Sequence, residues 1–409
     1  MTSKTDKTGE PVKAGRTNPF YIEVNCQQKN HHGERICGDV FQSARVNEES
    51  RVILVLSDGM GHGVKANMLA TLTATMALGF TREHKDITKI AEIIMNTLPV
   101  CSDRKISYST FTIVDIEENG MVNMLEYDNP PATILRGDSI FKPDWQHIRL
   151  QSKKNEGKEL RYCNFQPVKE DRIVFTTDGV SQSGLGSDLY PFGWGDENIQ
   201  QYLTKLIRNN LTLSARNVAS KIITMAHKND GYRAKDDTSC TVVYFREPRK
   251  LLICTGPPFE EKNDKKLADA VLNYNGKKIV CGATTSGIIA RELELEIEDS
   301  LEFSDPDLPP VSYMDGIDLV TEGILTLSKV ANILKNYTPN YTPGKGPADR
   351  IYRLLRESDE IDFIIGTRIN IAHQDPNLPV ELEIRRTVVK RIAKLLEEKF
   401  LKSVNLSFI

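Results

Sequence analysis

The sequence predicts an α+β fold for roughly the first 248 residues and a separate, smaller α/β domain over residues 249–409. Two patterns carry this prediction. In the first part, short apolar strands follow one another through tight turns, as in antiparallel sheets, and consecutive helices separate the groups of strands. In the last part, strands and helices alternate one by one, which is typical of an α/β domain. We therefore expect a domain boundary near Pro248.

Composition narrows the class of protein. The formal net charge is −3, with neither a basic excess nor an acidic tail, so we expect no nucleic acid partner. The apolar runs are far shorter than the ~20 residues that span a bilayer, and the polar start of the chain has no apolar signal core. We therefore expect a cytoplasmic protein without a membrane partner.

The seven cysteines give no sign of a disulfide framework. They are odd in number, scattered along the chain and without Cys-x-x-Cys spacing. We expect reduced thiols that pack as small apolar groups, and no zinc site built from them.

The first elements follow from apolar periodicity. Residues 1–18 are polar and without periodicity, which predicts a flexible tail, and ordered structure is expected to begin at residue 19, just before the alternating strand Tyr21–Val24. The apolar run Val52–Leu56 predicts a strand buried on both faces, and the Ala- and Leu-rich stretch after it predicts a helix. Asp86 can cap a second helix over 87–95.

A series of antiparallel hairpins comes next. Turn residues at Glu118–Gly120 and Arg136–Asp138 separate the strands, and Asn129-Pro130-Pro131 breaks one of them. A glycine-rich segment over 181–196, which contains Trp194, predicts an irregular flap. The other strands and helices of this domain are expected at 108–115, 121–127, 132–135, 171–177, 197–208, 214–227 and 238–245.

The second domain alternates between the two kinds of element. Its strands are expected at 251–255, 278–282 and 362–366, and its helices at 259–274, 347–356 and 383–400. After the second strand, a helix N-terminus could bind an anion through Thr284, Thr285 and Gly287. The alternative is a plain polar turn, because the Gly-x-Gly-x-x-Gly spacing is missing.

Four acidic residues share one sequence context. Each lies at the edge of an apolar strand, beside a glycine or a second carboxylate, and the four are Asp39, Asp58, Asp178 and Asp236. Like charges raise one another's pKa, so clustered carboxylates need a compensating charge. Mg²⁺ and Mn²⁺ supply that charge, prefer oxygen ligands, and act in pairs to activate water for attack on phosphorus.

Two other features near these residues are not expected to carry chemistry. Lys65 is followed by Ala66 rather than Ser or Thr, so the glycines before it do not form a nucleotide-binding loop. His31 and His32 are adjacent, and adjacent side chains on an extended chain point to opposite faces. We therefore expect these histidines to be loop residues rather than metal ligands.

Five segments occur in a characteristic order: Ser57–Gly63, Tyr108–Asp115, Asn129–Ala132, Thr177–Val180 and Asp236–Thr238. Together they resemble the motifs of PPM-type metal-dependent serine/threonine phosphatases, most closely the bacterial stage II sporulation protein E-like branch, over about residues 20–247. The resemblance implies two antiparallel β-sheets packed between helix layers. It also implies two Mn²⁺ or Mg²⁺ ions that activate water to hydrolyse phosphoserine or phosphothreonine on a regulatory protein.

Position by position, the resemblance implies a role for each site residue. Asp58 would bridge both ions, and the carbonyl of Gly59 would bind one of them. Asp39 would help to hold a metal, while Asp178 and Asp236 would complete the other coordination sphere. The four aspartates are therefore both the metal-ligand and the catalytic set.

The chain also departs from the family pattern. Arg35 lies four positions before Asp39 and stays outside the catalytic set, so the phosphate-binding arginine of the eukaryotic relatives has no clear counterpart. The bacterial branch usually has Ala-Gly-His before Pro-Pro, and this chain has Tyr127-Asp128-Asn129. Asp237 stands where many eukaryotic relatives have Asn, and we expect it to play a supporting role.

Two alternatives to a plain phosphatase stay open. The first domain could be a phosphatase-like sensor that binds a partner with little turnover, although all four aspartates are present. The second domain could be a separate small-molecule enzyme or binding module, or could regulate the first domain or recruit its substrate. An activating protein partner is also expected, since a small shift of the helix after Gly63 would move Asp58 and Gly59, and the related branch is often switched in this way.

Overall fold

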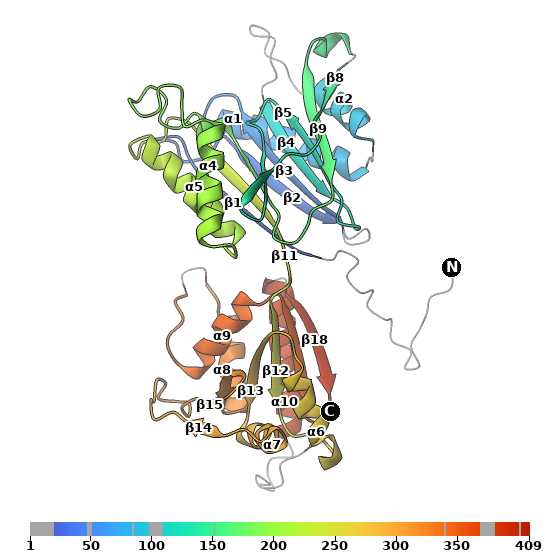
Figure 1. The fold of residues 1–409 in the computed structure, drawn as a ribbon, viewed down its shortest axis with the longest axis vertical. Helices are drawn as coiled ribbons and strands as arrows, with labels where there is room; N and C mark the ends of the chain where they lie inside the picture. Colours follow the sequence, from blue (N-terminus) through green and yellow to red (C-terminus); the bar gives the residue numbers. More distant parts are fainter. Residues whose placement is uncertain are drawn as a thin grey trace, which may run out of the picture. The chain divides into compact units, whose positions relative to one another are not determined.

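The computed structural model describes residues 20–46, 51–83, 86–97, 109–150, 152–338, 341–368, 381–400 and 402–409. The chain divides into an N-terminal unit, residues 1–247, and a C-terminal unit, residues 248–409 (Figure 1). The expected tail over 1–18, Tyr108 of an expected strand, and Cys101 lie outside the described residues. Among the described helices, none is long and apolar enough to cross a membrane.

The N-terminal unit contains two antiparallel sheets. The five-stranded sheet has the order β1 (Tyr21–Lys29), β11 (Thr238–Arg246), β10 (Arg172–Thr176), β6 (Thr133–Arg136) and β7 (Ser139–Phe141). The six-stranded sheet has the order β2 (Val40–Val46), β3 (Arg51–Gly59), β4 (Ser109–Ile116), β5 (Val122–Tyr127), β9 (Glu159–Phe165) and β8 (Gln146–Arg149). All strand pairs in both sheets are antiparallel.

Helices cover the outer face of each sheet, and the inner faces pack together. On the six-stranded sheet lie α1 (Gly63–Glu83) and α2 (Ile87–Thr97), and on the five-stranded sheet lie α4 (Asp196–Asn209) and α5 (Ala215–Asn229). Leu54 and Leu56 of β3 share one core with Ile173 of β10, whereas Ile53 and Val55 face the helices. This four-layer α+β arrangement confirms the predicted fold class. The strand predicted to be buried on both faces is buried on both faces.

Helix α1 approaches its sheet through small residues. Ala66, Ala70, Ala74 and Ala77 are all fully buried, and their spacing places them on one helical face. Alanines let the helix axis come close to the strands. The opposite face leaves Met68 exposed to solvent.

The irregular segment between β10 and α4 is held in place rather than loose. After the short helix α3 (Asp178–Ser181), the chain has no helix or strand until Asp196, as the sequence predicted. Trp194 is buried, and its ring lies 5.5 Å from that of Tyr202, centroid to centroid. This tryptophan anchors the segment to α4.

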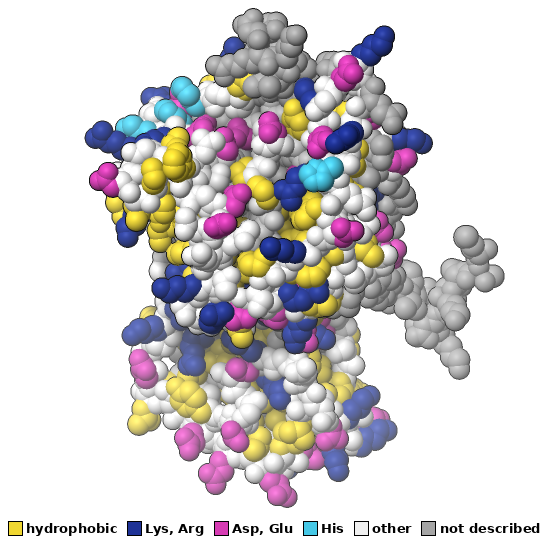
Figure 2. Space-filling view, turned by 45° about the horizontal axis from the view of Figure 1, so that its top comes forward, with side chains coloured by type: hydrophobic (Ala, Val, Ile, Leu, Met, Phe, Trp, Pro, Cys, Tyr) yellow, Lys and Arg dark blue, Asp and Glu magenta, His cyan; other side chains and the backbone are white. Residues whose placement is uncertain are grey.

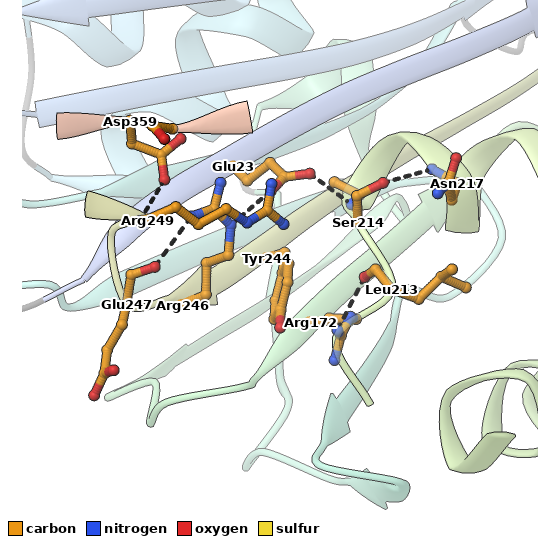
Figure 3. A network of polar contacts seen from close by, with 12 residues as sticks. Glu23, Arg172, Leu213, Ser214, Asn217, Tyr244, Arg246, Glu247, Arg249 and Asp359 are labelled. Carbon is orange, nitrogen blue, oxygen red and sulfur yellow. Dashed lines mark hydrogen bonds and ion pairs between the residues drawn. The ribbon is translucent and has the colours of Figure 1, made fainter. Parts of the chain in front are cut away.

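A network of polar groups fixes the end of the five-stranded sheet (Figure 3). Arg246 donates from Nε to Glu23 at 2.6 Å and thereby ties β11 to β1. The fully buried guanidinium of Arg172 stacks on the ring of Tyr244 at 3.7 Å and donates to the carbonyl of Leu213 at 3.0 Å. A buried charge needs such partners, so Arg172 fixes the loop before α5.

The C-terminal unit is built around a seven-stranded sheet. The strands are β14 (Ile297–Asp299), β15 (Ser312–Met314), β16 (Ile317–Thr321), β13 (Lys277–Cys281), β12 (Lys250–Thr255), β17 (Glu360–Ile365) and β18 (Ser403–Phe408), in spatial order. The last five strands are mutually parallel. β12 is the middle strand of these five and the first of them in the sequence. This order is that of a doubly wound sheet, which confirms the separate α/β domain.

Helices cover both faces of this sheet. One face carries α6 (Asp264–Leu272) and α7 (Ala283–Leu293), and the other carries α8 (Ile324–Lys335), α9 (Pro347–Glu357) and α10 (Glu381–Phe400). The helix expected over 259–274 is shorter than predicted. A 3-10 turn at Glu261–Asn263 precedes it and Phe259 is exposed, so the apolar signal at its start does not belong to the core.

Candidate metal centre

The structure brings the four predicted aspartates together at one end of the two sheets. Asp39 precedes β2 and Asp58 lies at the end of β3, whereas Asp178 begins α3 after β10 and Asp236 precedes β11. Each sheet therefore contributes two carboxylates. The charges of the other three aspartates all raise the pKa of Asp58, so the four carboxylates lie close enough to repel one another.

Glycines beside the aspartates allow the surrounding backbone to come close. A Cβ on Gly59 would lie 2.0 Å from the carbonyl oxygen of Ala66, and one on Gly179 would lie 2.1 Å from the carbonyl oxygen of Asp237. Either contact is far shorter than atoms tolerate. Glycine after Asp58 and after Asp178 is thus required by the close packing of backbone around the carboxylates.

Asp39 is held by two hydroxyl groups. Its Oδ2 accepts hydrogen bonds from Thr177 Oγ1 at 2.8 Å and from Ser239 Oγ at 2.6 Å, while its buried Oδ1 has no partner among the described residues. Burial raises the pKa of Asp39 to about 7, the hydroxyls oppose this, and the carboxylates of Asp237 and Asp236 add to it. An oriented carboxylate with one free oxygen suits a cation ligand.

Burial and neighbouring negative charges also disfavour the ionised forms of Asp58 and Asp236. Burial, followed by the charges of Asp39 and Asp178, raises the pKa of Asp58 well above its ordinary value. Burial and the charge of Asp178 raise the pKa of Asp236 to about 6. Divalent cations would remove this repulsion, so the carboxylates fit a binuclear Mn²⁺ or Mg²⁺ centre.

Asp237 is buried beside the acidic cluster. Its Oδ1 accepts a hydrogen bond from the backbone N–H of His31 at 2.9 Å, and its buried Oδ2 has no partner among the described residues. The same Oδ2 lies 2.6 Å from where a Cβ on Gly38 would be. The signal for this residue was the paired Asp236-Asp237, and the supporting role predicted for it stays a prediction.

A polar groove lies beside Asp178, and sequence analysis did not anticipate it. It has a volume of about 630 Å³ and is lined by Thr110, Glu126, Asp128, Asn129, Pro130, His147, Glu159, Arg161, Asp178 and Gln182. Asn129 fixes one wall, since its side chain accepts from Thr110 Oγ1 at 2.5 Å and donates to Thr112 Oγ1 at 3.0 Å. Of the four aspartates, Asp178 lines this groove.

Arg161 contributes a positive charge to this groove. Its guanidinium stacks on the ring of Trp145 at 4.3 Å and lies 3.4 Å from Glu126 Oε2. Burial is the main cause that raises the pKa of Glu126 to about 7. Arg161 lies on β9, more than a hundred residues from Asp58, and no local motif marks it. By contrast, the exposed Arg35 is not among the groove residues.

The C-terminal candidates lie where predicted, at the start of α7. Thr284 and Gly287 are open to solvent, whereas Thr285 is buried. Gly282, the residue before this helix, has a φ of 110°, and a Cβ there would lie 3.9 Å from Cα of Gly323, the residue before α8. Two helices thus begin side by side, and an anion site here stays a prediction.

Comparison with solved structures finds phosphatases. The PP2C phosphatase domain and a regulatory-domain fragment of the cell-fate determinant SpoIIE from Bacillus subtilis match at 17% identity and a TM-score of 0.46, over 56% of this chain and 64% of that one. RsbX in complex with magnesium matches at 18% identity and a TM-score of 0.39, over 55% and 95%. The serine/threonine phosphatase PstP/Ppp of Mycobacterium tuberculosis matches at 13% identity and a TM-score of 0.37, over 55% and 99%.

Sequence comparison identifies the family. No curated protein matches the chain. The family model for stage II sporulation protein E matches residues 48–246, a span that contains Asp58, Asp178 and Asp236 and ends at the last residue of β11. Residues 48–246 therefore form a domain of the stage II sporulation protein E family, a PP2C-type phosphatase domain.

Proposed function

We propose that the N-terminal unit is a metal-dependent protein phosphatase that hydrolyses phosphoserine or phosphothreonine on a regulatory protein. The observation that carries the proposal is the acidic cluster, since three of its four aspartates, Asp58, Asp178 and Asp236, lie within the segment that matches the phosphatase family. Burial and mutual repulsion raise the pKa of Asp39, Asp58 and Asp236 together. Repulsion among buried carboxylates destabilises the folded protein unless cations occupy the cluster. Strongly perturbed pKa values of this kind are typical of functional sites.

Five groups would hold two Mn²⁺ or Mg²⁺ ions. Asp58 would bridge the ions with the carbonyl of Gly59 beside it, and the remaining carboxylates are Asp39, Asp178 and Asp236. When bound, the ions would supply the positive charge that activates a water and neutralises phosphate oxygens.

Neighbouring side chains would keep these ligands in position. Thr177 and Ser239 hold Asp39 from the other sheet, and Gln182 donates to Asp178 Oδ2 at 2.8 Å. Residues that hydrogen-bond to metal ligands fix ligand orientation and typically contribute ~10–100-fold to affinity or activity. The proposed centre therefore extends beyond its carboxylates.

The groove would receive the phosphorylated segment. Arg161 can form paired hydrogen bonds to phosphate oxygens, and its stacking on Trp145 limits the orientations of the guanidinium. A groove that is open and lined by polar side chains suits an exposed loop of a protein better than a buried small molecule. A phosphoprotein is therefore the substrate class that we propose.

A protein partner would control this activity through α1. The carbonyl of Ala66, in the first turn of α1, lies against Gly59. A shift of the helix would therefore displace Gly59 and Asp58 relative to the other carboxylates. We expect weak basal activity, and a metal affinity that rises when the activating partner binds.

The test is phosphate release from a phosphoserine protein with and without Mn²⁺. Asp58→Asn and Asp178→Asn should abolish Mn²⁺-dependent release and leave the fold intact. Asp138→Asn is the matched control, since that carboxylate pairs with Arg208 on the surface at 2.9 Å. Turnover by Asp58→Asn within about tenfold of the parent would contradict the assignment. Mn²⁺ binding without any release, even with an activator, would favour a partner-binding sensor.

A further inference from the structure

A second group of metal-binding side chains lies next to the acidic cluster. Ligand atoms of His31, Glu34 and His62 all lie within 4.8 Å of one another. The imidazole Nδ1 of His62 is 2.8 Å from Glu34 Oε1, and the rings of His31 and His62 stack with centroids 4.4 Å apart and planes 10° from parallel. Histidine side chains lie near acidic ones on the surface of the N-terminal unit (Figure 2).

One ring nitrogen in this group has no hydrogen-bond partner. Nδ1 of His31 is buried and makes no hydrogen bond to any described residue. The backbone N–H of His31 donates to Asp237, so the ring belongs to a fixed turn. An unpartnered buried nitrogen in a fixed histidine is costly, and a bound cation would satisfy it.

The chain also makes room for the carboxylate. A Cβ on Gly63 would lie 2.6 Å from Glu34 Oε2, so a larger residue there would displace this carboxylate. Gly63 has a φ of 69°, which also favours glycine. The sequence around α1 is therefore compatible with Glu34 lying beside His62.

We propose that His31, Glu34 and His62 form a binding site for one transition-metal ion of the zinc class. Two imidazoles and a carboxylate match the ligands of three-residue zinc sites, which keep a fourth position for water. Zinc–ligand bonds of ~2.0–2.2 Å place ligand atoms ~3.3 Å apart, so side-chain rotations that bring them together by roughly 1–2 Å complete the site. The exposed ring of His62 has the freedom to make that movement.

Ligand chemistry separates this site from the carboxylate cluster. Imidazole prefers zinc, copper and nickel, whereas carboxylate, carbonyl and water prefer Mg²⁺ and Mn²⁺. The sequence favours loop roles rather than metal binding for both His31 and His32, and the proposed site departs from that expectation for His31. His32 is exposed and stays outside the site. The second histidine ligand comes instead from the loop before α1.

A metal here would join two segments that shape the acidic cluster. His31 and Glu34 belong to the turn that Asp237 holds, and His62 lies between Asp58 and the start of α1. The ion would thus tie the start of α1 to that turn. We expect it to reduce the motion of residues 61–66.

The experiment measures Zn²⁺ binding to the full chain after chelator treatment, by competition with a chromophoric chelator. Asp58→Asn/Asp178→Asn serves as the background, because it disables the carboxylate cluster. One Zn²⁺ should bind, Mg²⁺ should not compete, and Co²⁺ in its place should show the visible absorption of a four-coordinate site. His62→Ala and Glu34→Gln should weaken binding by at least about a hundredfold.

His32→Ala is the matched control and should bind Zn²⁺ like the parent. Unchanged affinity in His62→Ala and Glu34→Gln would overturn the proposal, as would equal loss in His32→Ala. Both test side chains are partly exposed, at 53% and 33%, so these variants should fold even if His31→Ala does not. Hydrogen exchange at residues 61–66 should slow with Zn²⁺ in the parent and in His32→Ala, but not in His62→Ala or Glu34→Gln. None of these readouts depends on phosphatase activity.

Discussion

Thr177 at the end of β10 donates a 2.8 Å hydrogen bond to Asp39 at the start of β2, and so joins the five-stranded sheet to the six-stranded sheet at the acidic cluster. The same hydroxyl accepts from the backbone N–H of Ser239 at 3.0 Å. One side chain thus positions a proposed metal ligand and the strand that follows Asp236. The geometry of the centre depends on this residue although it is not itself a ligand.

Replacement of Thr177 by Val should lower the affinity for Mn²⁺ and the turnover by at least about tenfold. Valine keeps the shape of threonine but removes the hydroxyl that orients Asp39. The measurement is a Mn²⁺ titration of phosphate release. Thr177→Ser retains the hydroxyl and should restore most of the affinity. An equal loss in Thr177→Ser would show that packing of the methyl group, not the hydrogen bond, is what matters.

Without metal, the free energy of unfolding should fall as pH rises from about 4 to about 7. Burial raises the pKa of Asp39 to about 7 and that of Asp236 to about 6, from 3.8. In this range the native state binds more protons than the unfolded state, so stability decreases with pH. Urea unfolding in chelator at several pH values measures the effect, and saturating Mn²⁺ should remove it. Asp39→Asn should flatten the dependence; the same slope as the parent would refute the assignment.

Gly59→Ala should disable the centre while every carboxylate is retained. The new Cβ would lie 2.0 Å from the carbonyl oxygen of Ala66, so α1 must move away from β3. We expect at least about a hundredfold weaker Mn²⁺-dependent turnover and a stability loss of ~1–3 kcal/mol. Gly79→Ala, within α1, is the control, because a Cβ at Gly79 meets no atom within 4 Å. This substitution should leave stability unchanged or raise it. Normal turnover in Gly59→Ala would contradict this account of α1.

Arg161→Gln should raise KM for a phosphoprotein by about tenfold or more, with a smaller change in kcat, if the groove binds the phosphorylated segment. Arg161→Lys should recover only part of the loss, because a point charge cannot form paired hydrogen bonds to phosphate. Steady-state kinetics gives both constants. Arg208→Gln is the control, since Arg208 lies on α4, is 67% exposed, pairs with Asp138 and does not line the groove. If both arginine variants behave alike, net surface charge rather than the groove is responsible.

A protein that ends at Pro248 should fold and hydrolyse a small aryl phosphate. The chain divides between Glu247 and Pro248, and all proposed ligands precede that point. Activity on the physiological phosphoprotein, or its control, should differ from that of the full chain. Circular dichroism, Mn²⁺ binding and aryl phosphate turnover are the measurements. Insolubility with loss of metal binding would show that the two units form one cooperative structure.

The N-terminal fold could be predicted because its signals are local and strong. Val52–Leu56 is uninterruptedly apolar since both faces of β3 are buried, one against helices and the other against the second sheet. Turn residues separate the hairpin strands at Gly120 and Gly137, which have φ values of 85° and 59°. Each of these features can be recognised within a few consecutive residues.

Parts of the C-terminal unit were missed for two different reasons. Strand β18 lies at the sheet edge, and three of its six residues are polar, so its apolar signal is weak. Helix α8 carried a signal that could have been used, because its buried residues Leu327, Val330, Ala331 and Leu334 recur at helical spacing. β16 has only three buried residues, too few for a pattern.

In the site, too, residues marked by their sequence neighbours could be predicted, whereas contacts between distant residues could not. Each of the four aspartates lies at the edge of an apolar strand, beside a glycine or a second carboxylate, so they could be singled out from the sequence. Arg161 and the contact between Glu34 and His62, 28 residues apart, have no such marker. Only the fold brings these side chains to the place where they can act.

The pairing of β1 with β11 determines when, during synthesis of the chain, the acidic cluster can form. Tyr21 pairs with Arg246, so the first strand of the N-terminal unit waits for the last, and β11 also separates β1 from β10. Contacts between such distant residues make folding slow. Asp236 enters with this final strand, so a ribosome that has synthesised most of the unit has still made no acidic cluster. At the proposed centre, binding of metal ions would therefore follow completion of the five-stranded sheet.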